Sequence, residues 1–328
     1  MNTINPKPVT IITGFLGAGK TTFLNAILSG GKTGKYAIIE NEFGKESIDG
    51  ELVLEVADSI FEMSSGCLCC SLNEDLVELL ISLSKKAVNF KELIIETTGI
   101  ADPASIGVPF LVDPLVTRYY ELQRVVCVVD AQNIAYELAS TEEARKQISF
   151  SDILLISKTD IVNPNELDNI KSLLYNINPF AIVLFVTDGK YPIDSIMNFK
   201  RNVEQVTANE DPSLSKHKEH HHHGLSSLTF LFDDPFDLPK LHHTLMIFLA
   251  VQAKDVYRVK GILNAQDEDQ KVIVQSVAQY LSLSHGKHWE DDEIKRSRIV
   301  FIGKDLQSKG FEKLLRQCLY KAELDKNV

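Results

Sequence analysis

A glycine-rich stretch near the N-terminus contains residues whose types and spacing suit phosphate binding. In "TGFLGAGKTT", Gly14, Gly19, Lys20 and Thr21 fit the pattern G-x-x-x-x-G-K-[ST]. A loop of this kind turns backbone N–H groups toward a phosphate, and its glycines omit the Cβ atoms that would obstruct a close approach. We expect Lys20 to bridge the β- and γ-phosphates of a nucleotide and Thr21 to offer its hydroxyl to Mg²⁺.

Two later stretches supply the remaining nucleotide contacts. In "SKTD", Ser157, Lys158 and Asp160 resemble the N-K-x-D element of GTPases, in which the aspartate accepts two hydrogen bonds that only guanine can donate. Lys158 would lie along the base, while Ser157 stands in place of Asn and leaves open one hydrogen bond that braces the loop. Glu96 ends the run "ELIIE" and could hold Mg²⁺ directly or through water. Gly99, three residues later, could offer its N–H to a γ-phosphate.

Three of the five cysteines form the cluster "CLCC", as Cys67, Cys69 and Cys70. Thiolates suit Zn²⁺, Cu(I) and iron–sulfur clusters, and a C-x-C pair can reach one ion, with Cys70 joining through a turn. Three thiolates leave a fourth position for a carboxylate, a water or a client protein's ligand, which suits a site that must release its metal. The clustering does not fit a secreted disulfide scaffold and favours a reducing cytoplasm.

The elements that must position these residues alternate between strands and helices. Continuous apolar runs predict strands at 8–12, 36–40, 92–96, 124–130, 152–157 and 181–186. Helical patterns cover 21–28 and 71–88, and the second opens with capping-box spacing. Strand–helix alternation predicts an α/β fold, a P-loop NTPase domain with a mostly parallel sheet flanked by helices.

A polar break divides the chain and predicts three parts. Residues 1–205 form the P-loop domain, 206–224 a His-rich linker, and 225–328 a small α+β domain. The linker contains five of the nine histidines, which could collect metal ions or simply be solvated. In the last part, strand patterns at 226–232, 256–263, 271–277 and 297–303 accompany two helical ones.

Composition excludes some partners. The formal net charge is −11, which argues against a nucleic-acid partner because phosphate backbones need a basic face. No apolar run approaches the roughly 18 residues of a spanning helix, so no membrane partner is expected.

Five motifs and their order along the chain resemble those of the CobW-type metallochaperone P-loop GTPases, with greatest similarity to the YjiA-like branch. The motifs are "TGFLGAGKTT", "ENEFGKESID", "GCLCC", "ETTGIADP" and "SKTD". The C-terminal stretches "YRVKGIL", "VQSVAQYL" and "SRIVFIG" are similar to that family's C-terminal domain. The resemblance implies GTP and Mg²⁺ bound through Gly14 to Thr22, and zinc, or in some members cobalt or nickel, bound by the thiols. The implied nucleotide loop consists of Gly14, Phe15, Leu16, Gly17, Ala18, Gly19, Lys20, Thr21 and Thr22.

The resemblance also implies roles for the stretch "ENEFGKESID". Glu40 and Glu42 become candidate oxygen ligands for the metal or for Mg²⁺, and Asp49 a contact to water near the γ-phosphate. Lys45 stands where many members carry Glu, so a metal site that uses this position is lost or moved. The C-terminal domain is assigned by analogy to partner recognition or dimerisation.

Three functions from different classes remain open at this point. The first is a GTPase with a slow intrinsic rate that couples GTP hydrolysis to metal transfer to a client metalloprotein. The second is a metal-storage or sensing protein whose GTP site is structural. The third, a small-molecule kinase, would need an arginine-rich lid that the sequence does not offer.

Overall fold

The chain divides into two compact units in the computed structural model. The structure describes residues 5–29, 36–40, 59–62, 72–85, 90–200, 217–222, 225–252 and 254–321. The first unit comprises Met1–Tyr175 and Ala181–Arg201, and the second Asn176–Phe180 and Asn202–Val328. The two units are described separately below. Among the described residues, no helix has the length and apolar character needed to cross a membrane.

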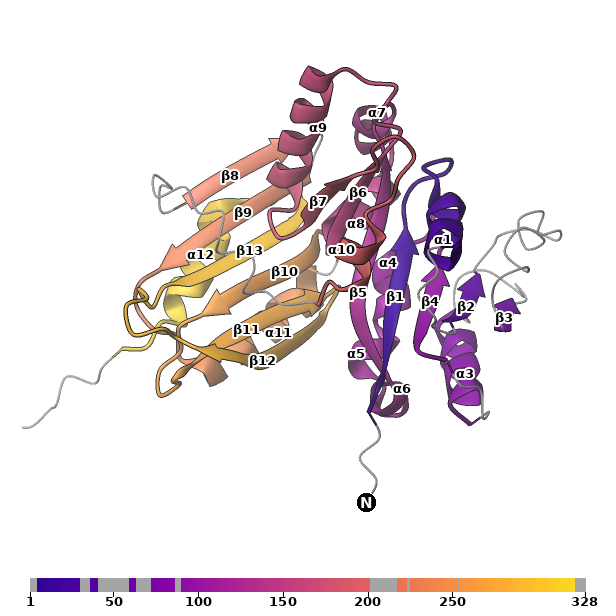
Figure 1. The fold of residues 1–328 in the computed structure, drawn as a ribbon. Helices are drawn as coiled ribbons and strands as arrows, with labels where there is room; N and C mark the ends of the chain where they lie inside the picture. The colour runs from indigo at the N-terminus through magenta and orange to yellow at the C-terminus, as the bar shows by residue number, and fades with distance from the viewer. Residues whose placement is uncertain are drawn as a thin grey trace, which may run out of the picture. The chain divides into compact units, whose positions relative to one another are not determined.

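The first unit is built on a seven-stranded parallel sheet in the order β3-β2-β4-β1-β5-β6-β7 (Figure 1). The strands are β1 (Lys7–Thr13), β2 (Tyr36–Glu40), β3 (Ser59–Glu62), β4 (Glu92–Glu96), β5 (Tyr120–Asp130), β6 (Ile153–Ser157) and β7 (Ile182–Phe185). The helices are α1 (Lys20–Ser29), α3 (Leu72–Lys85), α4 (Pro103–Gly107), α5 (Pro109–Val112), α6 (Pro114–Tyr119), α7 (Ile134–Ser140), α8 (Glu142–Phe150), α9 (Pro164–Ile177) and α10 (Ile193–Met197).

Helices cover both faces of this sheet, which explains why its strands are continuous apolar runs. Alternate strand residues such as Ile12, Ile38 and Val126 pack with α1 and α10 in one buried cluster. Helix α4 contacts β1, helices α5, α6 and α8 contact β5, and α3 packs against α4 and α6. The α/β class and the P-loop arrangement predicted from the sequence are confirmed.

The second unit is a six-stranded antiparallel sheet in the order β12-β11-β10-β13-β9-β8. Its strands are β8 (His217–His222), β9 (Leu225–Phe232), β10 (Val256–Leu263), β11 (Gln270–Val277), β12 (Tyr280–His288) and β13 (Ser297–Lys304), and its helices are α11 (Leu238–Gln252) and α12 (Ser308–Gln317).

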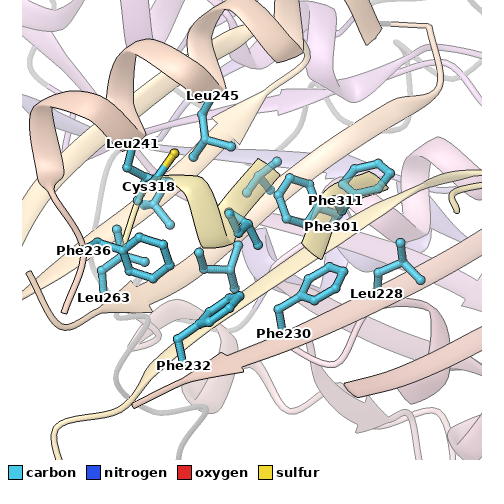
Figure 2. Close-up of a cluster of buried hydrophobic side chains, with 14 of the residues drawn as sticks. Leu228, Phe230, Phe232, Phe236, Leu241, Leu245, Leu263, Phe301, Phe311 and Cys318 are labelled. Carbon is cyan, nitrogen blue, oxygen red and sulfur yellow. The ribbon is translucent and has the colours of Figure 1, made fainter. Parts of the chain in front are cut away.

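Aromatic side chains from the sheet and from α12 form the centre of the second unit's core (Figure 2). The rings of Phe301 and Phe311 lie 4.8 Å apart in an edge-on arrangement, and those of Phe230 and Phe301 lie 6.1 Å apart. Leu241 and Leu245 of α11 complete the cluster, and both are fully buried. This confirms a small C-terminal α+β domain.

Two features of the second unit differ from the sequence prediction. Residues 217–222, predicted as part of a linker, form β8 and pair with β9 from His217 opposite Phe230 to His222 opposite Leu225. The prediction was wrong there because a polar strand at a sheet edge lacks the apolar run by which buried strands are identified. The edge strand β12 was missed for the same reason, since most of its residues are exposed or half-buried.

Candidate functional site

The glycine-rich loop joins β1 to α1, as the sequence predicted. Gly14, Gly17 and Gly19 have φ angles of 139°, 74° and 99°, a region that other residues rarely adopt. At Gly14 an added Cβ would lie 2.2 Å from the carbonyl oxygen of Val128, so the backbone approaches β5 too closely for any side chain. The loop therefore has the backbone shape that brings N–H groups up to a phosphate, with Leu16 exposed at its tip.

The two polar side chains that start α1 are both engaged. Lys20 is buried, and its ammonium donates a hydrogen bond to the carbonyl of Phe15 at 3.2 Å, within the loop that it would serve. The Thr21 hydroxyl donates to Glu96 Oε1 at 2.9 Å. Hydroxyl and carboxylate oxygens are the ligand type that Mg²⁺ prefers, so the side chains that meet here fit the predicted ion.

Glu96 also has an acidic neighbour on the next strand. Glu40 ends β2 directly opposite Glu96 in the parallel register, and neighbouring strands lie about 4.8 Å apart. Glu40 is buried. Glu62 ends β3 opposite Glu40, so three neighbouring strands each end in glutamate. The sequence singled out Glu40 and Glu96 separately but not their adjacency, which only the sheet order reveals.

The segment after Glu96 lies against the glycine-rich loop. The Thr97 N–H donates to the Ile12 carbonyl at 2.9 Å, and at Gly99 an added Cβ would lie 2.6 Å from the backbone nitrogen of Leu16. Gln147 of α8 donates from its amide nitrogen to the carbonyls of Gly99 and Ala101. No motif predicted a role for Gln147, because it lies 48 residues from Gly99 in the sequence.

The stretch "SKTD" follows β6 and is joined to the glycine-rich loop. The Ser157 hydroxyl lies 2.8 Å from the carbonyl of Ala18 and 3.1 Å from that of Val129, and it has one proton to donate. Serine in place of asparagine thus keeps a hydrogen bond that braces the loop. Lys158 adopts a φ of 56°, and Asp160 is exposed in the turn that follows.

A buried carboxylate at the end of β5 holds Lys158 in place. Asp130 Oδ2 accepts a hydrogen bond from the Lys158 ammonium at 2.7 Å, and the side-chain amide of Asn133 and the N–H of Gln132 also donate to this carboxylate. Burial alone would raise the pKa of Asp130, but these hydrogen bonds bring it below its ordinary value. Asp130 belongs to no motif recognised in the sequence.

A second buried carboxylate lies near the first. Glu137, in the first turn of α7, is 5 % exposed. Burial, and next the negative charge of Asp130, raise the pKa of Glu137 from 4.5 to about 7, although Lys158 and Lys20 oppose the shift. No sequence pattern marks this group, because an isolated glutamate in a helix is usually solvated.

Comparison with known proteins identifies the family of this chain. Residues 8–185 match the nucleotide-binding domain described as CobW/HypB/UreG, and residues 225–319 match the C-terminal domain described as that of the cobalamin synthesis protein cobW. This chain belongs to the CobW/HypB/UreG family. It is therefore a member of a P-loop GTPase family, as the sequence motifs indicated.

Relatives of the CobW/HypB/UreG family span nearly the whole chain. The zinc chaperone YjiA of Escherichia coli is 32 % identical over 92 % of this chain and 95 % of its own length. The zinc chaperone CobW of Pseudomonas aeruginosa is 26 % identical over 97 % and 93 % of the two chains. The crystal structure of Zn(II)-bound YjiA GTPase superimposes with a TM-score of 0.73 at 28 % identity, covering 97 % of this chain and all of that one.

Most of the metal-site predictions fall outside the described residues. This applies to Glu42 and to the thiols Cys67, Cys69 and Cys70, and Asp49, predicted to contact water near the γ-phosphate, also lies outside them. Within the described ranges, no group of three or more His, Cys, Asp or Glu side chains could hold a metal ion. Of the residues predicted to bind the transition metal, Glu40 is thus the one whose place in the fold the structure describes. The other two cysteines, Cys127 and Cys318, are buried.

Proposed function

We propose that this chain is a GTP-hydrolysing metallochaperone. It binds zinc through Cys67, Cys69 and Cys70, with Glu40 or Glu42 as an oxygen ligand, and it couples the state of the nucleotide to metal transfer to a client protein. Relatives named zinc chaperones along nearly the full chain support this proposal. The single observation that carries it is the register that sets Glu40 beside Glu96.

The nucleotide half of the proposal rests on the loop and its neighbours. Gly14 to Thr22 would cradle the phosphates, and Thr21 and Glu96 would hold Mg²⁺, which supplies charge stabilisation when bound. Lys20 would exchange its bond with the Phe15 carbonyl for phosphate oxygens. Asp160 would select guanine. We expect slow intrinsic turnover, because positioning and charge stabilisation determine the rate and an arginine finger is often supplied by a partner.

The proposed coupling of nucleotide and metal rests on the edge of the sheet formed by β4, β2 and β3. Glu40 precedes the stretch with Glu42 and Asp49, and Glu62 ends β3 five residues before Cys67. In the sequence, the three thiols therefore follow closely after the end of β3. A change at Glu96 on loss of the terminal phosphate would therefore be transmitted across the sheet to β3, two strands away. The cysteine ligands follow β3 in the sequence. Hydrolysis would then loosen the metal site.

GTP turnover with and without zinc tests the proposal. For the wild type with Mg²⁺, we expect zinc to change the rate of phosphate release, and we expect Cys67→Ala and Cys69→Ala to abolish this response. Cys318→Ala, which removes a buried thiol of the second unit, is the matched control and should keep the response. If zinc binds but the rate stays the same, the chain is a storage or sensing protein. Cobalt and nickel in place of zinc would test the metal's identity.

A further inference from the structure

The side chain of Gln147 connects helix α8 to the segment 97–102, which follows Glu96. Gln147 is 1 % exposed. Its amide nitrogen lies 3.0 Å from the Gly99 carbonyl oxygen and 3.2 Å from that of Ala101. A side-chain amide has two N–H groups, so both donors of Gln147 are used on this one segment.

Other contacts hold the two ends of the same segment, and within it the Ala101 N–H donates to the Thr98 carbonyl at 3.1 Å. At the start, the Thr97 N–H donates to the Ile12 carbonyl and the Thr97 hydroxyl lies 3.1 Å from that of Thr13. At the end, Asp102 lies 3.5 Å from the Lys146 ammonium, and both side chains are about one-third exposed. An ion pair with that exposure contributes little. Gln147 adds two hydrogen bonds from α8 to the middle of the segment.

The middle of the segment contains groups suited to a terminal phosphate. The Thr98 hydroxyl oxygen is buried and has no hydrogen-bond partner in the part of the chain that the structure describes. Gly99 packs directly on Leu16 of the glycine-rich loop. A buried hydroxyl without a partner costs free energy, so a ligand that supplies one is favoured.

We propose that Gln147 is a positioning residue for the γ-phosphate. By holding the carbonyls of Gly99 and Ala101, it fixes the segment so that the Thr98 hydroxyl and the Gly99 N–H lie ready for the terminal phosphate of GTP. GDP lacks that phosphate, so Gln147 contributes to the discrimination between the two nucleotides. This inference rests on the proposed function, because it takes GTP as the ligand.

Affinities for a non-hydrolysable GTP analogue and for GDP, measured by calorimetry with Mg²⁺ on the full chain, test the inference. Gln147→Met keeps the length and burial of the side chain but removes both donors. We expect the affinity for the analogue to fall about tenfold, which corresponds to about 1.4 kcal/mol, while the affinity for GDP stays within about twofold. A side chain with a merely structural role would lower both affinities together.

Two further variants complete the test. Ser149→Ala removes a hydroxyl that donates to the Arg145 carbonyl within α8 itself, and it should leave both affinities unchanged. Gln147→Asn keeps the amide but shortens its reach, so it should also lose affinity for the GTP analogue and not for GDP. It replaces Gln147→Met in the test if that variant does not fold. An equal loss for both nucleotides, or no loss, overturns the positioning role. A wild type that binds neither nucleotide overturns the proposed function instead.

Discussion

Replacing Glu137 by Gln should stabilise the protein above neutral pH and leave its stability nearly unchanged in mild acid. The pKa of Glu137 is about 7 in the folded chain, against an ordinary value of 4.5. The folded state therefore binds a proton that the unfolded state releases between these two pH values. Stability from this group is fully present below pH 4.5 and is lost as the pH rises to about 7.

The size of this effect follows from the two pKa values. A difference of one in pKa corresponds to about 1.4 kcal/mol, so the ionised Glu137 costs the folded state about 3 kcal/mol at about pH 8. The side chain is 5 % exposed, so screening by solvent is small. The substitution Glu137→Gln keeps the shape of the side chain and removes its charge. The free energy of unfolding of this variant should exceed that of the wild type by up to about 3 kcal/mol at about pH 8.

Urea unfolding followed by circular dichroism at about pH 5 and about pH 8 measures this difference. Comparing the two proteins at each pH cancels the contributions of the other titrating groups. Glu121→Gln, at an exposed position of β5, is the matched control and should show no pH-dependent difference. A difference between Glu137→Gln and the wild type that is the same at both pH values would refute the reasoning, as would a less stable variant at the higher pH.

Three further predictions concern the packing of the first unit. Gly14→Ala should destabilise the chain by at least about 2 kcal/mol more than Gly17→Ala, because both positions have positive φ but only the first would meet a backbone carbonyl of β5. Ser157→Ala should cost about 1 kcal/mol and weaken GTP binding, because it removes the brace to the loop. Arg124→Met should cost about 3–5 kcal/mol, because it leaves the buried carboxylate of Glu92 without its ion pair.

Urea unfolding measures the three changes in stability, and calorimetric titration measures the GTP affinity of Ser157→Ala. Each prediction has its own contrary result. Equal losses for the two glycine variants would contradict the close approach to β5. A Ser157→Ala protein with unchanged stability and GTP affinity would show that the brace is dispensable. For the ion pair, the double variant Arg124→Met with Glu92→Leu should regain part of the loss, and a single variant as stable as the wild type would contradict its importance.

The first unit could be predicted well from the sequence because its signals are local. Strands β1, β2, β4, β5, β6 and β7 are apolar runs, all but the edge strand β7 largely buried, and the P-loop motif lies between a strand and a helix. Strand β3 was missed because its sequence, SIFE, holds only two apolar residues, whereas the equally short β7, IVLF, is wholly apolar. The strands β8 and β12 lie at sheet edges, where one side is unpaired and polar residues are tolerated.

The candidate site could be predicted only where its residues belong to a motif. Lys20, Thr21 and Glu96 were found this way, and the sheet brings them together. Gln147 and Asp130 were missed, because their partners lie 48 and 28 residues away and no local pattern marks them. Such residues become visible once the order of the strands is known.

Competitive zinc titration in three nucleotide states tests the central claim most directly. The full chain would compete with a chelator for zinc in the presence of Mg²⁺ and a GTP analogue, of Mg²⁺ and GDP, or of Mg²⁺ alone. We predict zinc affinity at least about fivefold higher with the GTP analogue than with GDP, within the range usual for coupled sites. The difference should vanish in Cys69→Ala and Cys70→Ala. Equal zinc affinity in all three states would contradict the coupling of metal and nucleotide.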